Sequence, residues 1–272
     1  MFVTRTISAV VLVIVALVTL LTGGYLLAGV LLFLSLVAFR ELMQACKLTG
    51  KAKGITVPEV IGYAGIIVYY LFMVFSEERE FLFLTMIMIL VAFMFLYVLT
   101  FPKYHAEQIM SFFFCVAYGP IMLSFIYLVR SLPYGEYTVW MIFISSWICD
   151  TCAYIVGMLF GRHKLAPVLS PKKSIEGAIG GVVGSAVVGA LYGYFFVERV
   201  IADQNVTWAF VLISAVGAVI SQVGDLAASA IKRNHEVKDY GKLIPGHGGV
   251  MDRFDSVIFT APIIYLLVLI ML

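Results

Sequence analysis

The stretch FLFLTMIMILVAFMFLYVLT, residues 81–100, contains twenty consecutive residues without a charged side chain. A helix rises about 1.5 Å per residue, so this run is long enough to cross the roughly 30 Å hydrocarbon core of a bilayer. The whole chain shares this character, because 62% of its 272 residues are hydrophobic and only 12% are charged. Soluble domains average about 25% charged residues. The run therefore predicts a transmembrane helix, and the composition predicts a membrane protein.

Similar apolar segments recur along the chain, and we interpret nine of them as spans. They are residues 6–22, 24–39, 58–75, 81–100, 109–129, 137–160, 177–196, 206–231 and 254–272. The second segment is short for a span. The first is similar to the apolar part of a signal peptide, but no small-x-small cleavage site follows it, so we expect it to be retained.

The placement of Lys and Arg gives the orientation of these spans. With nine spans, the N-terminus and the loops after spans 2, 4, 6 and 8 share one side, which holds fifteen of the 18 basic residues. The other three are Arg79, Arg130 and Arg199. Basic loops stay in the cytoplasm. We therefore predict an all-α polytopic membrane protein of about nine transmembrane helices, with the N-terminus cytoplasmic and the C-terminus outside.

Asp150 and Asp225 are the only acidic residues well inside the predicted spans. A carboxylate in a bilayer is costly and usually marks a function or a polar cavity. Asp225 shares a helix face with Ser221, Ser229 and Lys232, which follows from the three- and four-residue spacing. Asp150 shares a face with Tyr154 and Gly157 in the same way. The alternative for both aspartates is a structural ion pair or a hydrogen-bonded helix contact.

From Asp225 the chain reads DLAASAIKRNHEVKDYGKLIPGHGGVMDRFD, which ends with Asp252, Arg253 and Asp255. Three carboxylates are expected to meet where the last two spans join this loop. Oxygen-only ligand sets suit Mg²⁺, which is usually shared with substrate phosphates. This pattern predicts a metal site, with Asp150 as a further candidate ligand.

Positive charge and glycine accompany these carboxylates. The basic residues are Lys232, Arg233, Lys238, Lys242 and Arg253, enough charge to hold a polyphosphate. The run GHGG, Gly246–Gly249, permits positive φ and close backbone approach, so its N–H groups are suited to phosphate oxygens. His247 is either a phosphate contact or a structural hydrogen-bonding residue of the turn.

The other basic loop, GRHKLAPVLSPKKSIEGAIGG, covers residues 161–181. Lys172 and Lys173 precede Ser174, which is a suitable N-cap for the next span, and helix N-termini favour anions. The lysines are thus candidate phosphate ligands, and the alternative is that they only set the topology. The overlapping GxxxG spacings of Gly177, Gly180, Gly181 and Gly184 indicate helix packing.

The CDTC sequence at 149–152 has the spacing of redox or zinc motifs, but it lies in an apolar run without a second cysteine pair. We interpret these cysteines as small packing residues. Walker, GxSxG, HExxH and GxGxxG motifs are absent from the sequence.

The segment SAIKRNHEVKDYGKLIPGHGGVMDRFD, Ser229 to Asp255, resembles the signature of the CDP-diacylglycerol synthase family, also called phosphatidate cytidylyltransferases. Every fixed position of that signature is filled. These positions are Ser229, Lys232, Arg233, Lys238, Asp239, Gly241, Pro245, His247, Gly248, Gly249, Asp252, Arg253 and Asp255. SQVGDLAAS and the segment after Asp150 are also similar to recurrent family segments, whereas residues 1–135 match only as a hydrophobic bundle.

The resemblance implies a Mg²⁺-dependent transfer of CMP from CTP to phosphatidate. It implies N-terminal transmembrane helices in residues 1–135 and a cytidylyltransferase membrane domain in residues 136–272, with cytoplasmic loops 161–176 and 232–253. The expected catalytic residues are Asp225, Lys232, Arg233, Asp252 and Arg253. Expected metal ligands are Asp225, Asp252, Asp255 and Asp150, and a second cation is left open. Expected substrate-binding residues are Ser170, Lys172, Lys173, Ser229, Lys238, Asp239, His247, Gly248 and Gly249.

The phosphate of phosphatidate is already ionised near neutral pH, because the second pKa of a phosphate monoester is about 6. We therefore expect positioning and charge stabilisation rather than a general base. Expected partners are CTP, phosphatidate and membrane lipid, without nucleic acid and with a homodimer as one candidate assembly. The expected location is the cell membrane, with several spans and the active site facing the cytoplasm. The alternatives are a CTP-dependent lipid-alcohol kinase and a secondary transporter, although the halves show no convincing inverted repeat.

Overall fold

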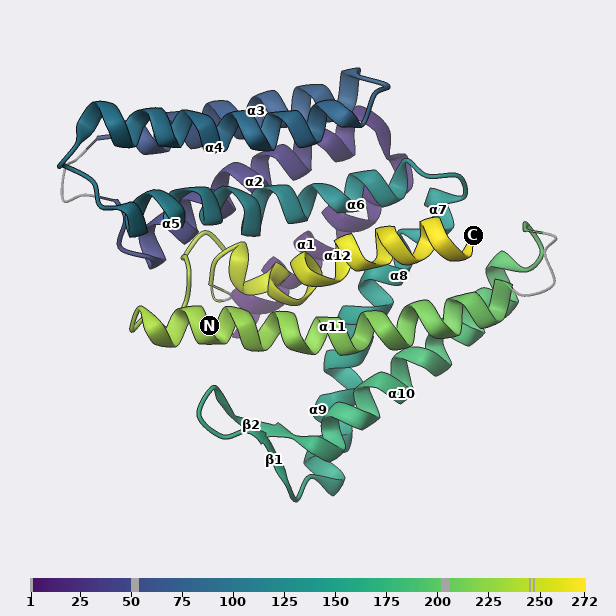
Figure 1. Cartoon of the computed structure of the whole chain (residues 1–272). Coiled ribbons are helices and arrows are strands. Elements are labelled where there is room, and N and C mark those ends of the chain that lie inside the picture. Colours follow the sequence, from purple (N-terminus) through teal and green to yellow (C-terminus); the bar gives the residue numbers. More distant parts are fainter. Residues whose placement is uncertain (1, 50–53, 202–205, 245, 247) are drawn as a thin grey trace. The chain divides into compact units, whose positions relative to one another are not determined.

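The computed structural model describes residues 2–49, 54–201, 206–244, 246 and 248–272, with side chains from residue 10 onward. The chain packs as two compact units, Met1–Tyr127 with Asn234–Arg253, and Leu128–Arg233 with Phe254–Leu272. Figure 1 traces the helices in chain order. This grouping leaves the predicted functional division at residues 135/136 as a prediction.

The first unit is built from long apolar helices. They are α1 (Phe2–Thr22), α2 (Gly24–Ala45), α3 (Val57–Phe75), α4 (Glu80–Thr100), α5 (Ala106–Val116), the π-helical turn η1 (Ala117–Ile121) and α6 (Met122–Arg130), which runs past the unit boundary. Inside the unit, Phe39, Phe93 and Phe112 are fully buried. Phe95 and Leu99 of α4 are 65% and 80% exposed. An exposed apolar surface of this kind marks contact with a membrane or with another protein, and on a helix this long and apolar it fits a membrane.

The second unit contains both short and long helices and the only strands of the described residues. Its elements are α7 (Gly135–Thr138), α8 (Trp140–Phe143), η2 (Ile144–Ile148), α9 (Cys149–Phe160), β1 (Lys164–Ala166), β2 (Ser170–Ser174), α10 (Ile175–Tyr192), η3 (Gly193–Val197), α11 (Val206–Asn234) and α12 (Met251–Met271), which begins in the first unit. The strands pair antiparallel, with Lys164 opposite Ser174 and Ala166 opposite Ser170.

Eight helices or helix combinations of the described residues are long and apolar enough to cross a membrane, and Val10–Thr22 is a shorter apolar segment. The helical, multi-pass membrane fold is therefore confirmed. Two details of the prediction were wrong. The second span does not end at residue 39, because α2 continues to Ala45. The all-α prediction also left out the β1–β2 hairpin, which lies within the loop at 161–176.

Candidate active site

Glycine lets α9 and α10 of the second unit cross at close range. A Cβ atom at Gly177 would lie 2.6 Å from the carbonyl oxygen of Ala153, and one at Gly181 would lie 2.9 Å from that of Cys149. Gly184 faces the sulfur of Cys152 in the same way. The helix-packing prediction for the GxxxG spacings is confirmed, and so is the packing interpretation of the two cysteines, both of which are free thiols.

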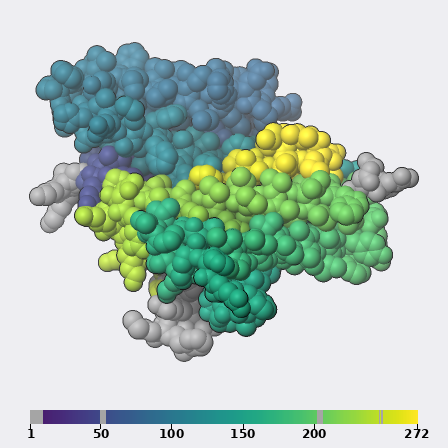
Figure 2. Space-filling view, turned by 60° about the horizontal axis from the view of Figure 1, so that its bottom comes forward, coloured from purple at the N-terminus to yellow at the C-terminus, as the bar shows by residue number. Residues whose placement is uncertain are grey.

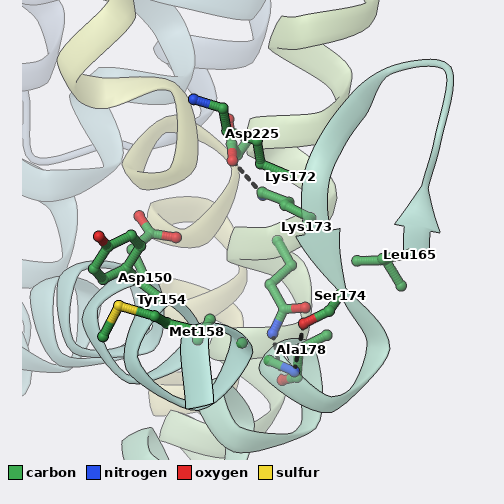
Figure 3. Close-up of a pocket in the computed structure, with 13 residues that line it drawn as sticks. Asp150, Tyr154, Met158, Leu165, Lys172, Lys173, Ser174, Ala178 and Asp225 are labelled. Carbon is green, nitrogen blue, oxygen red and sulfur yellow. Dashed lines mark hydrogen bonds and ion pairs between the residues drawn. The ribbon is translucent and has the colours of Figure 1, made fainter. Parts of the chain in front are cut away.

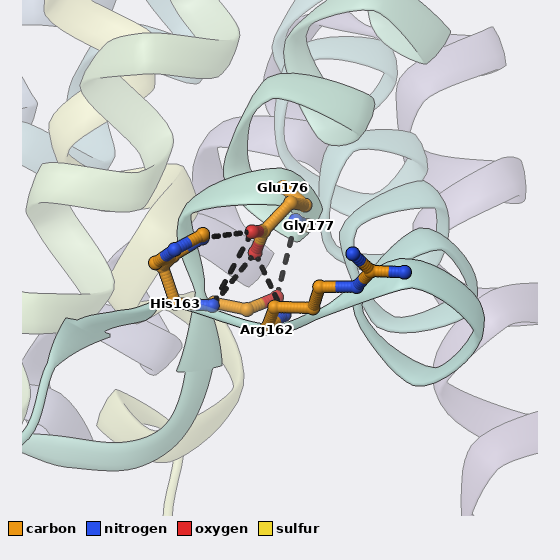
Figure 4. A network of polar contacts seen from close by, with 5 residues as sticks. Arg162, His163, Glu176 and Gly177 are labelled. Carbon is orange, nitrogen blue, oxygen red and sulfur yellow. Dashed lines mark hydrogen bonds and ion pairs between the residues drawn. The ribbon is translucent and has the colours of Figure 1, made fainter.

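The first turn of α10 fixes the hairpin. The backbone N–H of Gly177 donates to the Ser174 hydroxyl at 3.1 Å, which confirms Ser174 as the N-cap. The Glu176 carboxylate accepts the N–H groups of Arg162 at 3.1 Å and of His163 at 3.2 Å, and it contacts Nδ1 of His163 at 2.6 Å (Figure 4). The N–H of Ile175 donates to the His163 carbonyl at 2.9 Å. Both ends of the hairpin are thus attached to the start of one helix.

This arrangement forms one wall of a cavity of about 370 Å³ between the hairpin, α9, α10 and α11. Lys172, Lys173 and Asp225 lie toward one end of the lining, and Asp150, Tyr154 and Met158 lie along α9 (Figure 3). Asp150, Tyr154 and Gly157 all line the cavity, as their shared face predicted. In the space-filling view, the teal hairpin and α9 stand beside green α11 on the near face (Figure 2). The cavity therefore joins charged groups to an apolar wall.

Lys173 and Asp225 form an ion pair in this cavity, between the Nζ atom and Oδ2. Both side chains are only about one quarter exposed, 26% and 27%. Asp150 interacts electrostatically with both of them. Two of the predicted site residues, one on β2 and one on α11, are therefore brought into contact, and a third lies nearby.

Asp255 joins the same set of charges from α12. A Cβ atom at Gly224 would lie 3.0 Å from the Asp255 carbonyl oxygen, so this glycine permits the close approach of α11 and α12. Asp255 interacts electrostatically with Asp225, Asp150 and Lys232. Ser229 and Lys232 lie farther along α11, and Arg233 is its penultimate residue.

The carboxylates of this cavity and of Asp255 match a metal ion in the type of donor atom that they offer. Asp150, Asp225 and Asp255 offer only oxygen, as Mg²⁺ prefers. Ser221, one turn before Asp225, has a fully buried hydroxyl without a hydrogen-bond partner among the described residues. A buried polar group of this kind is costly without a partner. Over the part of the chain that the structure describes, however, no three His, Cys, Asp or Glu side chains are grouped closely enough to form a ready-made metal site. The metal site remains a prediction.

The signature loop, which is the segment of residues 235–250 between α11 and α12, belongs to the first unit and lines a cavity of about 650 Å³. Its lining residues are Lys238, Asp239, Gly241, Lys242, Ile244, Gly246, Gly248 and Arg253. Gly246 and Gly248 have φ angles of 79° and 86°, so the predicted positive φ in this run is confirmed at both. The N–H of Ile244 donates to the Gly248 carbonyl at 2.9 Å and closes the turn.

The Asp252 carboxylate stabilises the signature loop through hydrogen bonds to its backbone. Its Oδ2 atom accepts the N–H groups of Tyr240 at 2.8 Å and of Gly249 at 3.0 Å. The structure therefore assigns Asp252 a structural contact, while its predicted role as a metal ligand stays a prediction. Ser170 lies at the far end of β2 from Ser174, and His247 lies outside the described residues.

Two residues of these regions were missed by the sequence interpretation. Gln222 lines the cavity of the second unit, and its Nε2 donates to the Ala178 carbonyl at 3.0 Å. Its position three residues before Asp225 on the same helix was the available signal. Glu41 is buried within α2 and contacts the signature loop, so Asp150 and Asp225 are not the only acidic residues inside apolar helices. It was missed because the predicted span stopped just before it.

Comparison with known proteins extends the resemblance over the whole chain. The sequence model of the cytidylyltransferase family matches residues 3–271. The chain is 35% identical over 270 residues to a phosphatidate cytidylyltransferase of Staphylococcus aureus, with 97% of this chain and 98% of that protein covered. The enzymes of the same name from Staphylococcus epidermidis and Staphylococcus saprophyticus are 33% and 32% identical over the same shares. Residues 1–135 thus match as sequence and not only as a hydrophobic bundle. The chain belongs to the cytidylyltransferase family.

Proposed function

We propose that this chain transfers CMP from CTP to phosphatidate, forming CDP-diacylglycerol and releasing pyrophosphate. The observation that carries this proposal is the cavity of the second unit, where Lys172 and Lys173 adjoin Tyr154 and Met158. These two apolar side chains are 71% and 65% exposed, which suits contact with lipid. Phosphatidate combines the same two properties, because its phosphate is linked through glycerol to apolar acyl chains.

The reaction is an in-line displacement at phosphorus. A phosphate oxygen of phosphatidate forms a bond to the α-phosphorus of CTP, and the bond from that phosphorus to the bridging oxygen of the β-phosphate breaks. Pyrophosphate leaves with the electron pair. The attacking phosphate is already anionic, so no side chain has to remove a proton.

The chain's own groups hold and neutralise the phosphates. Lys172 and Lys173 on β2 supply charge in the second unit, and Lys238, Lys242 and Arg253 supply it in the loop of the first unit. Charge placed beforehand in a site with little water stabilises a transition state strongly. The N–H groups of the glycine turn are additional donors for phosphate oxygens.

Mg²⁺ is the proposed cofactor, and a second cation is left open. Asp225, Asp150 and Asp255 would hold it in the second unit, and the predicted role of Asp252 as a metal ligand is kept as a separate proposal for the first unit. When bound, Mg²⁺ supplies positive charge against the phosphates and the departing pyrophosphate.

We further propose nine spans with the N-terminus and the site in the cytoplasm, since CTP is a soluble cytoplasmic nucleotide and the basic loops share one side. A homodimer also remains a proposal. Cysteine-accessibility labelling of engineered cysteines in loops 161–176 and 232–253 tests the orientation.

The decisive experiment incubates the purified protein in detergent with phosphatidate and CTP, with and without Mg²⁺. Label on the α-phosphate of CTP is expected to enter the lipid only when Mg²⁺ is present. Transfer of label from the γ-phosphate instead, to a lipid alcohol, would show a kinase and overturn the proposal.

A further inference from the structure

Glu41 is a buried acidic residue that the proposed reaction leaves unused. It lies on α2 and is only 5% exposed. Its Oε1 atom accepts the N–H of Val250 at 3.1 Å, and Oε2 accepts the N–H of Met251 at 2.9 Å. These are N–H groups at the start of α12, where a helix has unpaired donors and favours negative charge. The carboxylate therefore joins α2 to the end of the signature loop.

The glycines around Glu41 show how closely the loop follows it. A Cβ atom at Gly241 would overlap Oε1 of Glu41, and one at Gly249 would overlap Oε2. Neither glycine has a positive φ angle, so backbone conformation does not explain why glycine occurs at these two positions. At these two signature positions a side chain would have to displace the Glu41 carboxylate, which glycine leaves in place.

Asp252 completes the framework from the other side of the loop, through the N–H groups of Tyr240 and Gly249. Two carboxylates thus hold four backbone N–H groups between Tyr240 and Met251. Gly246, Gly248 and Arg253, the proposed phosphate contacts of this loop, lie within or next to that stretch. Hydrogen bonds to charged groups are the stronger ones in proteins.

We propose that Glu41 is a positioning residue for the signature loop, and that it holds this loop in the conformation that binds CTP. This inference rests on the proposed function, because it takes the loop to bind the triphosphate. Glu41 itself touches no substrate. Without the Glu41 carboxylate, the signature loop no longer stays in the conformation that binds CTP. Part of the free energy of CTP binding is then used to order the loop, so CTP binds more weakly.

The test compares Glu41→Gln and Glu41→Ala with a matched pair at Glu59. Glu59 is a buried acidic residue of the same unit, 7% exposed, that accepts the N–H of Thr56 at 2.7 Å and caps α3. We expect Glu41→Ala to raise the KM for CTP about 10-fold or more, which is the loss expected for hydrogen bonds to a charged group. Glu41→Gln keeps one acceptor oxygen, so we expect its KM for CTP to lie between those of the wild type and Glu41→Ala. Both Glu59 variants leave this KM within about twofold, the usual spread for a change outside the site.

A second test uses the predicted overlap at Gly249. Gly249→Ala is expected to lower kcat/KM about 10-fold or more in the native background, because the new methyl group displaces the Glu41 carboxylate. In the Glu41→Ala background the same substitution has room, so its additional effect shrinks to about twofold or less. Equal effects in both backgrounds contradict the proposal.

Hydrogen exchange provides a readout that does not depend on activity. Glu41→Ala is expected to accelerate exchange at Gly249, Val250 and Met251 in the full chain, while Glu59→Ala does not. If wild-type protein transfers no CMP, the proposed function fails, and the exchange result still decides whether Glu41 orders the loop. An unchanged KM together with unchanged exchange in folded Glu41→Gln protein overturns the inference.

Discussion

Lys173 on β2 and Asp225 on α11 are ion-paired through Nζ and Oδ2, each with about a quarter of its side chain exposed. Fifty-two residues separate them in the chain. The lysine of one predicted phosphate-binding loop thus lies directly against the carboxylate of the predicted metal site. Removing one partner of a partly buried ion pair costs more free energy than removing one partner of an exposed pair.

Replacing Lys173 tests the first half of this pair. Lys173→Ala is expected to lower kcat/KM for CMP transfer about 10- to 100-fold, because a charged phosphate contact is lost and Asp225 is left unpaired. The initial rates with labelled CTP measure it. Lys164→Ala is the control, since Lys164 lies on the partner strand of the same hairpin and does not line the cavity. Equal losses in the two variants would contradict a role for Lys173 at the site.

Asp225→Asn keeps the shape of the side chain and removes its charge. We expect at least about 100-fold less CMP transfer, because a carboxylate ligand of a catalytic metal contributes several kcal/mol. Mg²⁺ titration of the remaining activity should shift to higher concentration. Glu198→Gln, an exposed acidic residue of the same unit, should leave both quantities unchanged. Near-native activity of purified, folded Asp225→Asn would falsify the metal assignment.

The apolar wall of the cavity predicts a separate effect on the lipid substrate. Met158→Asn places an amide where the exposed thioether lines the apolar wall of the cavity. The KM for phosphatidate is expected to rise several-fold while the KM for CTP stays constant, since one buried methylene contributes about 0.8 kcal/mol. Met88→Asn is the control, because Met88 is 63% exposed on α4. A change in both KM values alike would argue against lipid binding at this wall.

The close crossing of α9 and α10 predicts a loss of stability at Gly177. An alanine methyl there would lie 2.6 Å from the Ala153 carbonyl oxygen and 3.1 Å from the Gly157 Cα. Gly177→Ala is expected to lower the free energy of unfolding by about 1–3 kcal/mol, the usual cost of overpacking. Thermal unfolding in detergent measures it. Gly29→Ala on α2 has open space around the new methyl group and should be neutral or stabilising, because alanine favours helix.

The helices were largely predictable because each one is a long apolar run between charged or turn residues. Residues 81–100 were predicted as a span, and α4 covers Glu80–Thr100. The hairpin was not predictable, because its strands are only three and five residues long and lack apolar alternation. Periodicity carries no signal over so few residues.

Individual residues of the site could be predicted from the sequence, whereas contacts between residues far apart in the chain could not. Asp225, Lys172 and Lys173 were identified from their charge and placement, and all three line one cavity. Glu41 lay just outside the predicted span, and its role was also hidden because its hydrogen-bond partners, Val250 and Met251, lie 209 and 210 residues away in the chain. A contact at that separation leaves no local pattern, and a single sequence contains no other trace of it.

The attachment of the hairpin to the first turn of α10 has a consequence for the choice of substrate. Glu176 and Ser174 fix both ends of the strand pair to a helix that is apolar enough to cross the membrane. In the proposed membrane orientation, Lys172 and Lys173 are therefore held at a fixed depth relative to the bilayer surface. A phosphate carried by acyl chains reaches that depth each time it diffuses in the leaflet. A soluble phosphate monoester reaches the lysines only from bulk solution, so we expect the proposed reaction to favour phosphatidate over a soluble phosphate monoester.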